Sequence, residues 1–201
     1  MLALAIAGVP TTVDGTQDGI RLAVSVQDTG GNPGAVIAVS GVFQDDRFVN
    51  ALESGFPLRL DFQLELRESK RNWFDRSVGG FGWDYVIVYD PVREEFLLDD
   101  GLETLVISSR EALRRRVETQ YDAGSYPPDG EGTYYYRATL EAITLSDEDI
   151  DEVYDWLRGD ADTTVDRTPS PLTRVARRLL VQVAPLPQER ASANSRTFRW
   201  P

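Results

Sequence analysis

The residues best suited to chemistry in this chain are carboxylates, because its 201 residues include no Cys and no His. Disulfides, thiolate catalysis and imidazole acid–base or metal chemistry are therefore excluded together. Asp61 and Glu65 share one side of an alternating stretch, and a pair of carboxylates can carry out acid–base catalysis. Arg59, Gln63 and Arg67 are interleaved with them, which favours charge pairing with neighbouring strands. We predict no catalytic residues and keep a carboxylate-based hydrolase as the alternative.

Two further acidic groups raise the question of metal or partner binding. Asp160, Asp162 and Asp166 are spaced somewhat like calcium ligands, but the sharp-turn Gly and the closing Glu of an EF-hand are missing. The acidic run over residues 147–155 can be read as a docking surface for a basic partner. Its first carboxylates fall in the first turn of an expected helix, where the helix dipole already favours them. We predict no metal site and no cofactor.

The second group of candidate residues is aromatic. Trp73, Phe74, Phe81 and Trp83 surround three glycines in the stretch RNWFDRSVGGFGW, residues 71–83. These glycines match no phosphate-binding motif, although a glycine-rich loop can cradle an anion. An aromatic loop between two strands can contact a partner or a small ligand, or its tryptophans can close the end of the core. The four aromatic residues are our candidate binding site.

The charge of the chain bears on the kind of partner. A formal net charge of −12 disfavours nucleic acid and anionic lipid. Residues 171–201 carry six Arg and one Glu, so this end is net +5 and the preceding residues are net −17. No segment reaches the roughly 20 apolar residues that span a bilayer. An apolar fraction of 41% can fill the core of one domain.

The elements that must position these residues are mostly strands. Residues 58–67, LRLDFQLELR, alternate apolar and polar without exception, as an antiparallel strand with one buried face does. The same reasoning predicts other strands over residues 19–28, 35–43, 83–90, 94–100, 102–108 and 134–145. Residues 185–195 are expected to be poorly ordered, and residues 197–201 to pair with a sheet edge.

Helices are expected where apolar residues recur at helical spacing. They are predicted over residues 45–55, 110–122, 147–159 and 172–184. Ser108 with Glu111, and Ser146 with Asp149, have the capping-box form, and Gly55 suits a helix C-terminus. The resulting fold class is a strand-rich α+β fold, an antiparallel sheet or β-sandwich with three to four helices at its edges or ends.

The predicted organisation has three parts. Residues 1–10 form an apolar segment, residues 18–160 the main α+β domain, and residues 171–201 a basic amphipathic helix and tail packed on that domain. The segment LALAIA resembles the end of a signal peptide with a small-x-small cleavage site, but no Lys or Arg precedes it. We expect a misplaced start or a truncated signal, with the mature chain beginning near Gly8. The alternative is an apolar strand or a frayed end.

A family resemblance rests on the order of these elements. A helix ending in ALESG, then FPL, the strand RLDFQLEL, NWFD, the hairpin VIVYDPVREEF and a helix begun by SSREAL resemble the bacterial domain of unknown function 4390 family (DUF4390). The resemblance covers roughly residues 18–160. It implies an exported or envelope-associated protein, with no established activity and no catalytic residues to carry over. Some members are encoded beside a membrane sensor kinase, which implies a link to envelope signalling.

These observations lead to two functional hypotheses. The first is a non-enzymatic, exported bacterial protein, located in the periplasm or cell envelope, whose sheet is a scaffold for protein–protein interaction with an envelope or membrane protein. The alternative is a small-ligand or lipid binding module that uses the aromatic, glycine-rich loop. A cytoplasmic location is the alternative to export.

Overall fold

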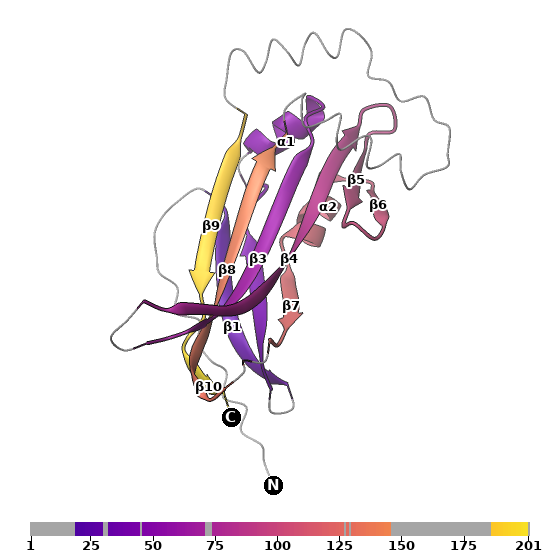
Figure 1. The fold of residues 1–201 in the computed structure, drawn as a ribbon. Helices are drawn as coiled ribbons and strands as arrows, with labels where there is room; N and C mark the ends of the chain where they lie inside the picture. The colour runs from indigo at the N-terminus through magenta and orange to yellow at the C-terminus, as the bar shows by residue number, and fades with distance from the viewer. Residues whose placement is uncertain are drawn as a thin grey trace, which may run out of the picture.

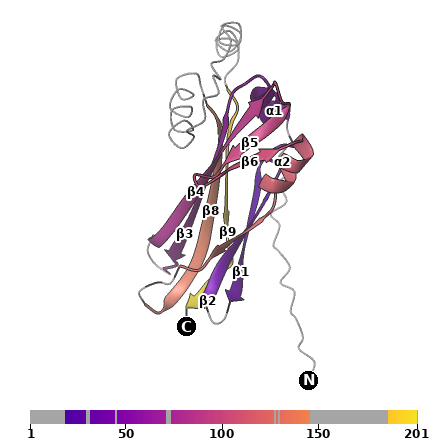
Figure 2. The same ribbon diagram turned by 90° about the vertical axis from the view of Figure 1, so that its right-hand side faces the viewer.

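The chain forms two antiparallel sheets that pack face to face, as the computed structural model shows (Figures 1 and 2). The structure describes residues 19–29, 32–44, 46–70, 74–126, 128, 130–145 and 186–200. The hydrophobic core lies between the two sheets and continues under two short helices. This architecture confirms a strand-rich α+β fold built on antiparallel pairing.

The larger sheet has seven strands in the order β10-β8-β3-β4-β5-β6, with β9 also paired to β8. Its strands are β3 (Leu58–Glu68), β4 (Arg76–Asp90), β5 (Glu95–Asp99), β6 (Thr104–Ile107), β8 (Gly132–Thr144), β9 (Gln188–Asn194) and β10 (Phe198–Trp200). Strands β9 and β10 share one edge of β8, because each pairs with a different part of it.

The smaller sheet has three strands in the order β1-β2-β7. They are β1 (Arg21–Thr29), β2 (Asn32–Ser40) and β7 (Gln120–Gly124). Strand β7 was not predicted, because its residues were assigned to the end of the helix over residues 110–122. That helix ends at Val117, and Glu118 caps it through its backbone N–H.

The alternating strand is the centre of the large sheet. β3 pairs with β4 on one side and with β8 on the other along its whole length. Its five apolar residues are all almost completely buried: Leu58, Leu60, Phe62, Leu64 and Leu66. The predicted strand over residues 58–67 is thus confirmed, together with the assignment of its apolar face to the core.

Two helices lie in the described part of the chain, α1 (Asp46–Glu53) and α2 (Arg110–Val117). α1 buries Phe48 and Leu52, as its spacing predicted, and Gly55 follows it with a φ of 90°. The N-cap of α2 is Ser109, one residue later than the predicted Ser108. The expected three to four helices are not matched, since two are found; those predicted over residues 147–159 and 172–184 lie outside the described residues.

Neither α1 nor α2, the helices of the described residues, has the length and apolar character that crossing a bilayer requires.

One side of the sandwich is closed where β1 lies beside β9. The backbone N–H of Ile20 donates to Glu189 Oε1 at 2.6 Å, and Arg47 lies 3.7 Å from the same carboxylate. We call this the closed seam. The prediction that residues 185–195 are poorly ordered is wrong, because β9 pairs with β8 over residues 188–194 and turns Ala191 and Ala193 away from its exposed side. The predicted edge pairing of the terminal aromatic segment is confirmed by β10.

Candidate functional site

The opposite side of the sandwich contains a long strand edge. β5 pairs with β4 only from Val86 to Asp90, and within the described part of the chain residues 76–85 have β3 as their single strand neighbour. The expectation of an aromatic loop before residue 83 is therefore wrong. β4 begins at Arg76, so Phe81 and Trp83 lie within a strand.

A row of aromatic rings leads from the core to this edge. The ring of Phe62 on β3 stacks on Trp83 with centroids 4.9 Å apart and planes within 4°, and Phe81 lies 5.9 Å from Trp83. Exposure rises along the row, from 2% at Phe62 to 42% at Phe81. Trp83 is half-buried and packs on the core.

β7 contributes a ring that sequence reasoning missed. Tyr121 lies 5.3 Å from Phe62 and 6.0 Å from Trp83, and its hydroxyl donates to the carbonyl of Val117 at 2.7 Å. Burial raises the pKa of Tyr121 above its ordinary value, so the phenol remains neutral at physiological pH. The alternation of QYDAG over five residues was the available signal, but it is short and directly follows a helix.

The ends of the aromatic row are also defined. At one end, the guanidinium of Arg116 lies 5.9 Å from the ring centroid of Tyr85, within cation–π distance. At the other end, Tyr126 covers Gly79, where an added Cβ would collide with the tyrosine ring. Tyr126 is 38% exposed. We call this surface the open seam and define it by Phe81, Trp83, Tyr85, Tyr121 and Tyr126.

The glycines of β4 serve the strand and not an anion-binding loop. Gly80 and Gly82 pair with Glu65 and Gln63, so they belong to the outer, polar face of the sheet. A Cβ at Gly80 would collide with the carbonyl oxygen of Leu64, and one at Gly82 would lie 2.8 Å from that of Phe62. Glycine is therefore needed for β4 to lie so closely against β3.

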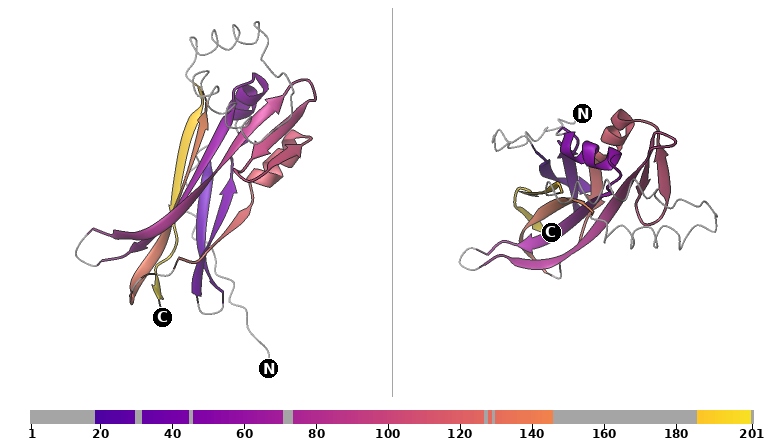
Figure 3. Two further views of the ribbon diagram at one scale, coloured as in Figure 1. Left: turned by 45° about the vertical axis from the view of Figure 1, so that its right-hand side comes forward. Right: turned by 90° about the horizontal axis from the view of Figure 1, so that it is seen from above.

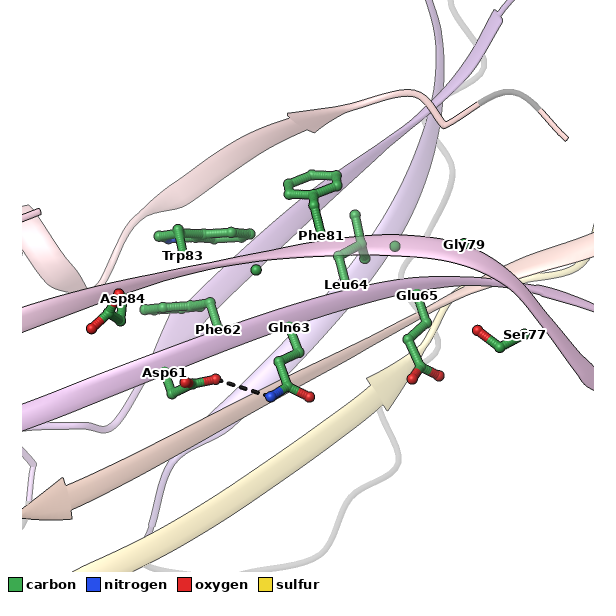
Figure 4. Close-up of a pocket in the computed structure, with 12 residues that line it drawn as sticks. Asp61, Phe62, Gln63, Leu64, Glu65, Ser77, Gly79, Phe81, Trp83 and Asp84 are labelled. Atoms are coloured by element: carbon green, nitrogen blue, oxygen red, sulfur yellow. Dashed lines mark hydrogen bonds between the residues drawn. The ribbon is translucent and has the colours of Figure 1, made fainter. Parts of the chain in front are cut away.

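A shallow groove of about 450 Å³ runs along these two strands. Figure 4 shows Phe62, Leu64, Phe81 and Trp83 on the core side of the ribbon, with Asp61, Gln63 and Glu65 on the other side. The charged residues that line it are three carboxylates, Asp61, Glu65 and Asp84. Every lining residue comes from β3 or β4, so no third element of the described chain encloses the groove.

The two candidate carboxylates of β3 do not form a pair. Asp61 accepts a hydrogen bond from the Gln63 amide at 3.2 Å, whereas Glu65 accepts one from Arg67 at 2.9 Å, which raises the pKa of Arg67. Arg59 lies 3.2 Å from Asp84 on the neighbouring strand, as predicted for cross-strand pairing. Asp61 and Asp84 lie opposite each other on the paired strands and share Arg59, which lies 4.0 Å from Asp61 and 3.2 Å from Asp84.

The far ends of β3 and β4 extend beyond the rest of the sandwich (Figure 3). Phe74 lies just before the start of β4 there and is 98% exposed, in the part of the hairpin farthest from the row of stacked rings. Asp75 accepts hydrogen bonds from the backbone N–H of Lys70 at 3.1 Å and from the Tyr135 hydroxyl at 2.9 Å. These bonds lower the pKa of Asp75. The structure therefore separates Phe74 from Phe81 and Trp83, and Trp73 lies outside the described residues.

The described residues contain no group of three acidic side chains that could hold a metal ion. The acidic run over residues 147–155 and the group of Asp160, Asp162 and Asp166 lie outside the described part.

The fold and this site define the class of protein as a strand-rich antiparallel sandwich with an aromatic-lined open seam. Residues 37–124 match the model of a domain of unknown function, DUF4390, and this match confirms the resemblance over that stretch of the chain. The matched stretch runs from β2 to β7 and so contains the whole open seam except Tyr126. Searches of curated proteins and of solved structures find no match.

Proposed function

We propose that this protein is a non-enzymatic interaction protein of the bacterial cell envelope and that an envelope or membrane protein binds its open seam. The observation that carries the proposal is the graded exposure of the stacked rings, which ends in Phe81 at 42% exposed beside a free strand edge. Aromatic side chains are enriched at protein interfaces, since they bury a large area at a small cost in entropy.

The shape of the groove favours a polypeptide over a small molecule. Small-molecule sites usually enclose most of the surface of their ligand, whereas this groove is lined by two adjacent strands alone. A small-ligand or lipid binding module is the second candidate, and the groove along β3 and β4 with its three carboxylates supports it.

The envelope location is proposed from the sequence. The N-terminal LALAIA segment resembles a signal peptide, and the family resemblance implies export. Fractionation of native cells tests the location directly. Recovery of the chain from the cytosol alone would overturn it.

The proposed partner can be tested by site-specific photo-crosslinking in cells. A photo-reactive amino acid at Phe81 is expected to capture one defined envelope protein. The matched control places it at Leu102, which is an exposed apolar residue in the turn between β5 and β6, at 94% exposed. Capture of the same proteins from both positions, or of none from Phe81, would contradict the proposal.

A thermal-shift screen against metabolites and lipids separates the second candidate. If the protein binds a small ligand in the groove, a compound will raise its melting temperature, and Trp83→Ala will abolish that rise while the fold is retained. A screen without any such compound, together with a captured protein at Phe81, favours the interaction protein.

A further inference from the structure

We infer that the partner binds by strand addition, in which an extended segment with alternating apolar and basic residues pairs with the free edge of β4 over residues 76–85. This inference rests on the proposed function and specifies the chemistry of the partner. Extended peptides commonly add a strand to an exposed sheet edge, where backbone hydrogen bonds provide affinity and alternate side chains provide specificity.

The first support is the length of the edge. Ten residues of β4 precede Val86, where pairing with β5 begins, and ten residues in a strand span about 33 Å. Among the other outer strands of the described structure, β6 has four residues, β7 five and β10 three, and the longer β1 and β9, of nine and seven residues, lie beside each other at the closed seam. β4 is therefore the place where a partner strand can form the most backbone hydrogen bonds.

The second support is the lack of protection along this edge. Natural proteins usually shield free edges with charged side chains, Pro, bulges or very short strands. Here a bulge at the pairing of Leu66 and Arg67 occurs near the start of β4, and the charged residues Arg76 and Asp84 lie toward its two ends. The residues between Val78 and Asp84 are Gly, Gly, Phe, Gly and Trp, without charge or proline.

The inner face of the edge selects apolar side chains. Phe81 and Trp83 point to the same side of β4 as the core residues Leu64 and Phe62, with which they pair. An added strand would place every second side chain next to these rings. Apolar residues at alternate positions would cover Phe81 and complete the packing between β4 and β7.

The outer face selects positive charge. Carboxylates of Asp61, Glu65 and Asp84 line the groove. Arg59 contacts Asp61 and Asp84, and Arg67 contacts Glu65. Gly80 and Gly82 leave two neighbouring positions on this face of β4 without side chains. An added strand lies two spacings from β3, or about 10 Å. Long Lys or Arg side chains on it can therefore extend over the glycines toward the acids of β3.

The test is a display selection of peptides as long as the free edge, performed on the complete folded chain. Selected peptides are expected to alternate apolar residues with Lys or Arg. When such a peptide binds, about every second backbone amide among residues 76–85 should exchange with solvent at least about tenfold more slowly. The same peptide should no longer bind when every second one of its own backbone amides, those that face β4, is N-methylated.

Two pairs of variants complete the test, one pair at Phe81 and a control pair at Leu102. Phe81→Lys places a charge in the edge and should weaken peptide binding at least about tenfold, and Phe81→Ala should weaken it less. Leu102→Lys and Leu102→Ala change an equally apolar, exposed residue away from the seam and should leave binding unchanged. Circular dichroism verifies that each variant is folded.

Three outcomes would overturn the inference. The first is selection of acidic or helical peptides, and the second is binding without new protection of residues 76–85. The third is a concentration-dependent dimer that Phe81→Lys abolishes, which would assign the edge to a second copy of the chain. If an envelope protein is captured at Phe81 but the amides are not protected, the proposed function remains and strand addition is rejected. If peptides are selected and protect the amides but no envelope protein is captured, strand addition remains and the proposed function is rejected.

Discussion

The closed seam and the open seam join the two sheets of the sandwich by different contacts. At the closed seam, one carboxylate binds the backbone of Ile20 at 2.6 Å and lies 3.7 Å from Arg47, so strands from opposite ends of the chain are held together. At the open seam, stacked rings fill the space between β4 and β7, and the outermost ring is 42% exposed.

The difference shows which side of the molecule is complete by itself. Polar contacts at the closed seam satisfy a backbone donor and leave little for a partner to add. The open seam still exposes apolar surface and a strand edge that no strand of the described residues pairs with, and each of these costs free energy in water. Substitutions at the closed seam should therefore lower stability without affecting binding, whereas substitutions at the exposed end of the open seam should lower binding with little loss of stability.

The largest effect is expected at the ring that anchors the open seam. Phe62→Ala removes a fully buried side chain and should lower the free energy of unfolding by about 3–5 kcal/mol. Urea unfolding followed by circular dichroism measures this change. A loss below about 1 kcal/mol would show that the stacked rings of Phe62 and Trp83 do not belong to the core.

A smaller effect is expected at the closed seam. Glu189→Ala removes the acceptor of the Ile20 amide, and leaving such a donor without a partner costs about 1–3 kcal/mol. Hydrogen exchange should accelerate in β1 more than in β7. Arg190→Ala, at an exposed residue next in the same strand, is the control and should change little. Equal acceleration in β7 would contradict separate roles for the two seams.

At the outer end of the open seam, the effects of a substitution on stability and on binding should differ most. Phe81→Ala should change the free energy of unfolding by less than about 1 kcal/mol, because the side chain is already 42% exposed. It should nevertheless weaken binding of the selected peptides measurably, though less than Phe81→Lys does, whereas Leu102→Ala should affect neither stability nor binding. A large loss of stability in Phe81→Ala would mean that Phe81 is a structural residue and not a binding residue.

The smallest effect on stability is expected at the end of the hairpin formed by β3 and β4, which belongs to neither seam. The pKa of Asp75 is lowered in the folded protein by hydrogen bonds from Lys70 and Tyr135, so the ionised carboxylate stabilises the fold above its ordinary pKa. That contribution is lost as the pH falls through the lowered value. A carboxyl titration by NMR should give Asp75 a midpoint below 3.8, and Asp75→Asn should abolish the acid-dependent change at Tyr135.

The elements that sequence could predict are those whose local pattern agrees with their final environment. Strict alternation in β3 reports directly that one face is buried, and the spacing of Phe48 and Leu52 reports the buried face of α1. These signals need only neighbouring residues. Both elements were predicted correctly for that reason.

The errors occurred where distant contacts decide the conformation. Gly79, Gly80 and Gly82 suggested a loop, yet they lie in a strand, because Gly80 and Gly82 fit closely against carbonyl groups of β3 and Gly79 fits under the ring of Tyr126. Likewise, QERASAN has low β propensity, and its pairing with β8 makes it a strand. The free edge of β4 could not be predicted, since it depends on where β5 ends.

The tie between Ile20 and Glu189 also has a consequence for the order of folding. The two groups are 169 residues apart in sequence, and β8 gains its outer neighbours only from residues 188–200. Contacts at such separation close slowly, because a long loop must first be ordered. During synthesis the sandwich thus stays incomplete until β9 has emerged, and an incompletely folded chain is available for transport throughout that interval, which suits the proposed export.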